Sequence, residues 1–328
     1  MVDEFDFEIG RMARSPKRSL IAQEIQARWL ELSAVADKLS GTQRAAAIAR
    51  RQDMLEALRV LLLTGHEALA WATERVSRSL TDSDDDDRAF GAYYAVTSGL
   101  AARALETFEE ILCLLENGLA RGARGRLRTL EEIFVVAGVI AYHGDPAGDH
   151  PSLPMRYIEH RDVFARGLAD ELIATGSLPD NHALDAETLA QLERRRTELV
   201  EKYGKEYQRL WGWASELFPP KTQINLGVLA ETLNVELRGF YSLSSRHVHA
   251  SSEGWHEARE DDGEEGDNAG FVGTFAAGYL VLTLQAVIPT RVVVDDEVAD
   301  RTGEAWSDAL VWLSLVARSQ EPPTGGGD

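Results

Sequence analysis

A histidine-rich stretch at residues 241–257, YSLSSRHVHASSEGWHE, gathers three of the chain's eight histidines, His247, His249 and His256, with a tyrosine and a run of serines. An imidazole titrates near neutral pH, so it can act as a general acid or base, and it is also a common metal ligand. Which chemistry applies depends on which of these side chains share one face of the element that carries them.

The surrounding pattern predicts a helix over residues 226–250, with apolar residues every three or four positions. On a helix, residues four apart lie one above the other. Tyr241, Ser245 and His249 have this spacing, in a Tyr-x3-Ser-x3-His pattern. The sequence therefore predicts that these three side chains form one polar stripe, about 100° round the helix from its apolar stripe.

The other two histidines do not join this stripe. His247 is two residues from His249, which on a helix means about 200° of rotation between their side chains. Gly254 indicates that the helix ends before His256. A zinc site built from all three histidines would need the helix to unwind, so surface positions for His247 and His256 are the favoured interpretation.

A second pair of reactive side chains lies in RLRTLEEIF, where Arg128 and Glu132 are four residues apart and share a helix face. The helix that carries them is apolar on most sides, so we expect it to be deeply buried and the charged pair to be internal. Buried charges need partners. The predicted partners are Tyr241, Ser245 and His249.

A metal site elsewhere is an alternative. The loop HGDPAGDH carries His143, Asp145, Asp149 and His150, and His160 follows ten residues later. These residue types bind metals, but their spacing matches no recognised ligand pattern. Aspartates are also ordinary turn formers. The favoured prediction is therefore no metal and no cofactor.

The composition limits the class of protein. The chain has 328 residues, 44% of them hydrophobic, with 54 Asp plus Glu against 34 Lys plus Arg and a formal net charge of -20. This charge favours solubility and works against loose binding to nucleic acid or anionic membranes. The single cysteine, Cys113, is expected to be a buried apolar residue. With no signal peptide and no apolar run of about 20 residues, the sequence predicts a cytoplasmic protein without a membrane partner.

The periodicity predicts an all-α multi-helix bundle. The expected helices cover residues 15–39, 42–80 with a break near 65, 89–118, 121–144, 155–176, 186–217, 226–250, 271–288 and 301–317. The helices at 89–118 and 121–144 are close in sequence and should form an antiparallel hairpin. In the sixth helix, Trp211 is expected in the core and Trp213 at a half-buried rim, where a partner or dimer surface is the sharper alternative. The predicted domains are a helical hairpin region at 1–82, a bundle at 88–258, C-terminal helices at 268–320 packing on the bundle, and a disordered tail at 321–328.

Three segments, taken in order, resemble domain-of-unknown-function family 5677, a family of bacterial helical proteins. They are LLENGLARGARGRLRTLEE with Gly118, Ala123, Arg128 and Glu132, MRYIEHRDVF with Arg156 and Tyr157, and YSLSSRHVHAS with Tyr241, Ser245 and His249. The resemblance covers roughly residues 90–254, and the family name implies no activity.

The pattern is also similar, more weakly, to the HEPN helical bundles. That resemblance implies a HEPN-like core with helical additions at both ends, a homodimer, and in many members a ribonuclease of toxin or defence systems with an Arg-x4–6-His signature. This chain has no arginine at that spacing before His249. Arg128 from another helix would have to take its place.

Two functions remain open at this point, and whether the chain is an enzyme stays undecided. The leading hypothesis is an interaction or regulatory module, in which the polar seam fixes helix register and the partner is a protein or a second copy of the chain. The alternative is a metal-independent ribonuclease acting on RNA. In it, His249 would be the general acid or base and Arg128 would hold phosphate. Glu132 would orient Arg128 or His249, while Ser245 and Tyr241 would donate hydrogen bonds.

Overall fold

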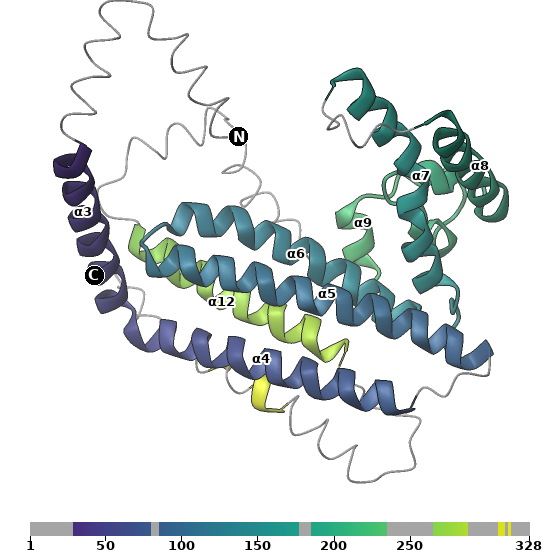
Figure 1. The fold of residues 1–328 in the computed structure, drawn as a ribbon. Coiled ribbons are helices and arrows are strands. Elements are labelled where there is room, and N and C mark those ends of the chain that lie inside the picture. The colour runs from purple at the N-terminus through teal and green to yellow at the C-terminus, as the bar shows by residue number, and fades with distance from the viewer. Residues whose placement is uncertain are drawn as a thin grey trace, which may run out of the picture. The chain divides into compact units, whose positions relative to one another are not determined.

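The computed structural model describes residues 29–79, 85–176, 185–234, 265–287, 308–311 and 314–315 (Figure 1). These residues form helices joined by turns and short loops, with no strand among them, so the predicted all-α multi-helix fold is confirmed. The likeness of the core to HEPN bundles stays a prediction. The chain divides into two units, Met1–Gln52 with Glu116–Gly118, and Asp53–Leu115 with Leu119–Asp328.

The first unit contains helix α3, Trp29–Arg50. Within this unit Arg44 forms an ion pair with Glu116, at 3.5 Å. A bend at Arg51 separates α3 from the next helix. The predicted boundaries here were wrong, because the chain stays helical from 39 to 42 and does not break near Gly65.

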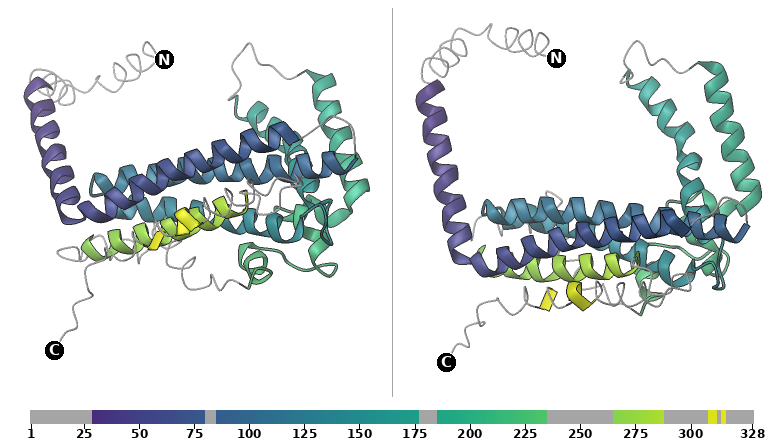
Figure 2. Two further views of the ribbon diagram at one scale, coloured as in Figure 1. Left: turned by 90° about the horizontal axis from the view of Figure 1, so that it is seen from below. Right: turned by 60° about the horizontal axis from the view of Figure 1, so that its bottom comes forward.

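Four long helices run side by side in the second unit (Figures 1 and 2). They are α4 Gln52–Ser79, α5 Asp85–Glu116, α6 Ala120–His143 and α12 Glu265–Gln285. Helices α5 and α6 form the predicted antiparallel hairpin: Arg126 pairs with Glu110, and a Cβ on Gly122 would lie 3.4 Å from Leu114. The turn between them contains Gly118 at φ 72°, a left-handed conformation that favours glycine.

Helix α12 packs into the groove formed by the other helices. A Cβ on Gly65 of α4 would come within 2.8 Å of Leu105 in α5 and 3.0 Å of Leu284 in α12, so this glycine lets three helices approach closely. From Ala269 to Gln285, α12 contains no charged residue. A helix that is apolar on nearly all sides is expected to be buried, and most of its side chains are.

The centre of the bundle is apolar. Its buried side chains include Met54, Leu55, Leu58, Leu61, Leu105, Phe108, Ile111, Leu130, Val135, Ile140, Val272, Leu280 and Leu284. Each large apolar side chain of this kind stabilises the fold by about 1.5–3 kcal/mol relative to leaving it exposed. Cys113, expected to be buried, is exposed, because it lies off the buried stripe of α5 formed by Leu105, Phe108, Leu112 and Leu115.

A second group of helices follows α6. It comprises α7 Leu153–Ala174, α8 Ala186–Tyr203, the 3-10 helices η2 Lys205–Gln208 and η3 Gly212–Leu217, and the short α9 Leu226–Glu231. Helices α7 and α8 are antiparallel, since Arg166 bonds to the Leu189 carbonyl while Glu159 bonds to Lys202. As predicted, Asp185 caps α8 by accepting a hydrogen bond from the Thr188 backbone at 2.7 Å.

Two predicted helices end earlier than expected. Helix α8 was predicted to reach residue 217 but ends at Tyr203, because Gly204 has φ 90°. The helix predicted over 226–250 is interrupted, because α9 ends at Glu231 and is followed by a turn in which Asn234 is left-handed, at φ 54°; residues 235–250 lie outside the described part of the chain. The tight 3-10 geometry after α8 also reverses the two tryptophans, so Trp213 is buried and Trp211 is half-buried.

Candidate functional site

The predicted pair on α6 is formed, but it is half-buried rather than internal. Arg128 Nε lies 3.5 Å from Glu132 Oε1, and the two side chains are 21% and 39% exposed. The pair therefore lies at the edge of α6, where an ion pair contributes under about 1 kcal/mol. Its predicted partners, Tyr241, Ser245 and His249, lie outside the described residues, as do His247 and His256.

The buried carboxyl group on α6 is that of Glu131, the residue beside this pair, which is 1% exposed. It faces α12, where it shares a hydrogen bond with Tyr279. Its oxygen Oε1 is buried and has no hydrogen-bond partner. We call Arg128, Glu131 and Glu132 together with Tyr279 the Glu131 seam.

Burial raises the pKa of Glu131 from about 4.5 to about 7, and the negative charge of Glu132 adds to this effect. The charge of Arg128 and the hydrogen bond with Tyr279 oppose it. Burial, followed by the neighbouring Glu131, raises the pKa of Tyr279 as well. Near neutral pH, Glu131 therefore exists in both protonation states, the property that a general acid–base or a proton-sensing group requires.

Sequence reasoning missed Glu131, although a signal was present. Glu131 is four residues after Leu127 and three before Phe134, both of which are buried. It therefore occupies a position of the apolar stripe of α6. The ring of Phe134 also stacks on Tyr279, with centroids 5.3 Å apart, so the partner residue is fixed by aromatic packing.

A second buried charge lies in α7, at Arg156, which is 5% exposed. Its Nε donates to the Trp213 carbonyl at 2.9 Å, and its Nη2 donates to Ser215 Oγ at 2.8 Å. Glu216 Oε2 lies 3.7 Å from Nε. The guanidinium therefore connects α7 to the backbone and side chains of η3.

Two tyrosines complete the surroundings of Arg156. The guanidinium lies over the rings of Tyr203 and Tyr207, at 4.6 and 5.3 Å from their centroids. The Tyr207 hydroxyl in turn donates to the Arg156 carbonyl at 2.5 Å, and burial raises its pKa. We call Arg156 and its contacts with Tyr203, Tyr207, Gly212, Trp213, Ser215 and Glu216 the Arg156 cage.

The side chain of His160, one turn further along α7, is also hydrogen-bonded within the protein. Its Nε2 lies 3.0 Å from the carbonyls of both Tyr207 and Arg209. Carbonyls only accept hydrogen bonds, so Nε2 carries a proton. Burial lowers the pKa of His160, with a smaller contribution from the charge of Arg156. This nitrogen is therefore engaged by the backbone and is not available to bind a metal.

The loop histidines approach each other without forming a metal centre. The rings of His143 and His150 have centroids 6.4 Å apart, and burial lowers the pKa of His143. Asp145 accepts a hydrogen bond from the Ala147 backbone at 2.8 Å, the turn-forming role expected for aspartate. Within the described part of the chain, no group of three or more histidine, cysteine, aspartate or glutamate side chains is arranged to hold a metal.

Ser152 is not an activated nucleophile. Its hydroxyl donates to Glu216 Oε2 at 2.9 Å, while His150 Nδ1 is 4.0 Å from the other carboxylate oxygen. The carboxylate thus lies between serine and histidine. A serine nucleophile requires the imidazole to be its direct partner.

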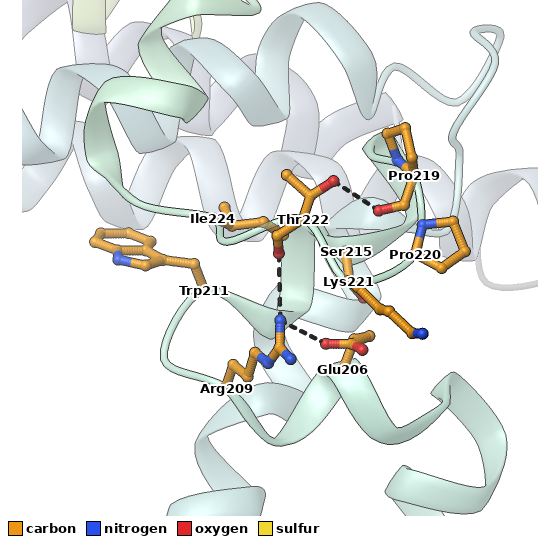
Figure 3. Close-up of a pocket in the computed structure, with 9 residues that line it drawn as sticks. All are labelled: Glu206, Arg209, Trp211, Ser215, Pro219, Pro220, Lys221, Thr222 and Ile224. Carbon is orange, nitrogen blue, oxygen red and sulfur yellow. Dashed lines mark hydrogen bonds and ion pairs between the residues drawn. The ribbon is translucent and has the colours of Figure 1, made fainter.

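A small pocket lies beside η3, between Trp211 and the loop after the helix (Figure 3). It encloses about 30 Å³, room for no more than one or two water molecules. The arginine in its wall is already engaged, since Arg209 pairs with Glu206 at 2.7 Å and donates to the Thr222 carbonyl at 3.2 Å. This pocket is too small for an organic substrate.

Comparison with known proteins gives one match. A family model described as a family of unknown function (DUF5677) matches residues 94–266, slightly more than half of the chain. Searches of curated proteins and of solved structures gave no match. No helix among the described residues is both long enough and apolar enough to span a membrane.

Proposed function

The chain belongs to the family of unknown function DUF5677, and from that premise we propose that it is a helical interaction or regulatory module. The observation that carries this proposal is the use of its buried polar side chains. The side-chain hydrogen bonds of Arg156 and His160 attach α7 to the segment that contains η2 and η3. Glu131 likewise joins α6 to α12. In such a module, the predicted polar seam fixes helix register; its members are Arg128, Glu132, Tyr241, Ser245 and His249. The partner is a protein or a second copy of the chain.

The pocket beside η3 does not offer room for a small organic ligand. A pocket for a small organic ligand has a volume of roughly 300–1,000 Å³. The pocket beside η3 encloses about 30 Å³. A partner recognised through helix surfaces needs no such cavity.

Thermal melting tests the proposed structural role of the seam. We expect His249→Ala to lower Tm by several degrees, and Glu132→Ala to lower it by less, because the half-buried Arg128–Glu132 pair contributes under about 1 kcal/mol. Arg161→Ala, at an 85% exposed side chain on α7, is the control and should leave Tm unchanged. If Glu132→Ala and His249→Ala both melt as the wild type does, the structural role is wrong.

A metal-independent ribonuclease is the second candidate, and the exposure of the Arg128–Glu132 pair favours it. The described residues on both sides of the segment that carries Tyr241, Ser245 and His249 contact α6. Leu233 packs on Gly138, while Phe271 lies 5.9 Å from the Arg124 guanidinium. These two contact points on α6 are 14 residues apart, roughly 21 Å, and Arg128 lies between them in sequence.

This candidate is tested with a panel of RNAs. It expects cleavage by the wild-type protein, a loss of roughly a hundredfold or more in His249→Ala, and a comparable loss in Arg128→Ala. Arg161→Ala should cleave as the wild type does. Absence of cleavage by the wild type, or unchanged cleavage by His249→Ala, rejects the ribonuclease and leaves the interaction module standing.

A further inference from the structure

Glu131 is the buried acid of the described bundle whose hydrogen-bonding capacity is left incomplete. It is 1% exposed, one carboxyl oxygen interacts with Tyr279, and Oε1 has no partner. A buried carboxylate with an unpaired oxygen is costly, whereas a protonated carboxyl in the same place is not charged. The packing around Glu131 therefore suits its neutral form.

The helix that this carboxyl faces is mainly apolar. Between Ala269 and Gln285, α12 carries no charged side chain, and it lies on α6 through apolar and aromatic packing, including the stack of Phe134 on Tyr279. Tyr279 is the α12 residue that interacts with the Glu131 carboxyl. A change in the charge of Glu131 is thus felt directly at the α6–α12 interface.

The charged groups around Glu131 do not compensate its ionised form. On α6 itself, Arg128 favours ionisation and Glu132 opposes it. On α12, the group that faces it is Tyr279. On α5, the pairing of Glu110 with Arg126 places the buried Leu105 level with Glu131.

We propose that Glu131 and Tyr279 form a proton-operated contact: the protonated carboxyl holds α12 on α6, and ionisation of the carboxyl loosens α12. This proposal concerns regulation of the bundle and does not depend on the function proposed above. Its direction follows from burial. An acid whose pKa is higher in the folded state than in the unfolded state destabilises the fold as pH rises between the two values. With the folded value about 7 and the ordinary value about 4.5, loosening develops as the pH rises through this window and is complete above it.

Hydrogen exchange of the full-length chain, followed by mass spectrometry at several pH values between 5.5 and 8, tests this device. After correction for the intrinsic pH dependence of exchange, we expect protection of the α12 backbone to fall at least tenfold over this range in the wild type. Glu131→Gln, which keeps the shape of the protonated acid, should show no such fall. Glu132→Gln removes the neighbouring charge that raises the pKa of Glu131, so this variant should keep the fall but show it at lower pH than the wild type.

Two outcomes overturn the proposal: pH-independent protection of α12 in the wild type, or a fall in Glu131→Gln as large as that of the wild type. If Glu131→Gln does not fold, the variant Tyr279→Phe tests the proposal instead. The hydrogen bond with Tyr279 favours the ionised carboxyl, so its loss should move the loosening of α12 to higher pH. An unchanged midpoint in Tyr279→Phe contradicts the contact.

Discussion

The Arg156 cage and the Glu131 seam both bury an ionisable side chain between helices, but they differ in how completely it is hydrogen-bonded. Arg156 donates to the Trp213 carbonyl and to Ser215, and lies over two tyrosine rings. Glu131 has one partner, Tyr279, and a buried oxygen with none. A saturated buried charge is fixed in one state, because any change leaves polar groups unpaired. An unsaturated buried carboxyl is costly to ionise, so its pKa rises towards neutrality and its protonation state changes within the physiological pH range.

This contrast separates structural from functional candidates better than burial alone. By burial, Arg156 and Glu131 look alike, since they are 5% and 1% exposed. Their hydrogen bonding differs. The bonds of the Arg156 cage attach α7 to η3. The seam is the place where the bundle responds to its surroundings.

The largest effect is expected in the cage. Arg156→Ala removes the donor to the Trp213 carbonyl and to Ser215 and leaves a space beneath Tyr203. We expect a loss of about 3–5 kcal/mol in the free energy of unfolding, measured by urea denaturation. Arg161→Ala, on the same helix but exposed, should change it by less than about 1 kcal/mol. Similar values for the two variants would show that the contacts of Arg156 do not hold α7 on η3.

The next effect is a pH-dependent change in the seam. Comparing Glu131→Gln with the wild type, we expect the difference in unfolding free energy to move in favour of the variant by roughly 3 kcal/mol between pH 4.5 and pH 8. Only the wild type loses stability as the folded-state carboxyl is forced to ionise. Urea denaturation at both pH values measures this difference. A difference that does not vary with pH contradicts the raised pKa of Glu131.

A third test returns to the backbone beside the cage. A Cβ on Gly212 would lie 2.5 Å from the Glu206 carbonyl oxygen and would also contact the carbonyl oxygen of Tyr207. Both are backbone atoms, which cannot move aside as the end of a flexible side chain can. We expect Gly212→Ala to destabilise by about 2–3 kcal/mol. Gly167 of α7 has open space around it, so Gly167→Ala should stabilise by about 0.5–1 kcal/mol through its better helix propensity. Both values come from denaturation curves, and a tolerated Gly212→Ala would mean that η3 is more adaptable than described.

The smallest effect concerns His160. Burial lowers its pKa in the folded state, so the unfolded chain binds a proton more readily below about pH 6.5. His160 therefore contributes a loss of stability as the pH falls through this region, and the difference in unfolding free energy between His160→Gln and the wild type should move in favour of the variant. His66, which is exposed, provides the control His66→Gln, expected to keep the slope of the wild type. Equal slopes in His160→Gln and wild type would reject the buried neutral imidazole.

The sequence predicts features whose cause is local. The cap at Asp185, the turn at Gly118 and the buried stripe of α5 each follow from neighbouring residues. The left-handed Asn234 was missed, because most residue types avoid this conformation and only the fold selects where it occurs. The exchange of Trp211 and Trp213 arose in the same way, from applying an α-helical period to 3-10 geometry.

The candidate site was predicted in part for a related reason. The spacing of Arg128 and Glu132 correctly indicated an ion pair on one helix face. Burial of Glu131 depends on α12, which lies more than a hundred residues later in the sequence. No local sequence pattern indicates which residue of α12 contacts Glu131. The prediction therefore centred on the Arg128–Glu132 pair. The roles of Tyr241, Ser245 and His249 stay predictions.

The most direct test of the account is the titration of Glu131 itself. Carbon NMR of the side-chain carboxyl in the selectively labelled wild-type chain, assigned by comparison with Glu131→Gln, reports its protonation without any effect on folding being assumed. The account predicts a midpoint of about 7. A midpoint near the ordinary value of about 4.5 would mean that Glu131 is ionised in the folded bundle at neutral pH. That result would contradict the distinction drawn between the seam and the cage.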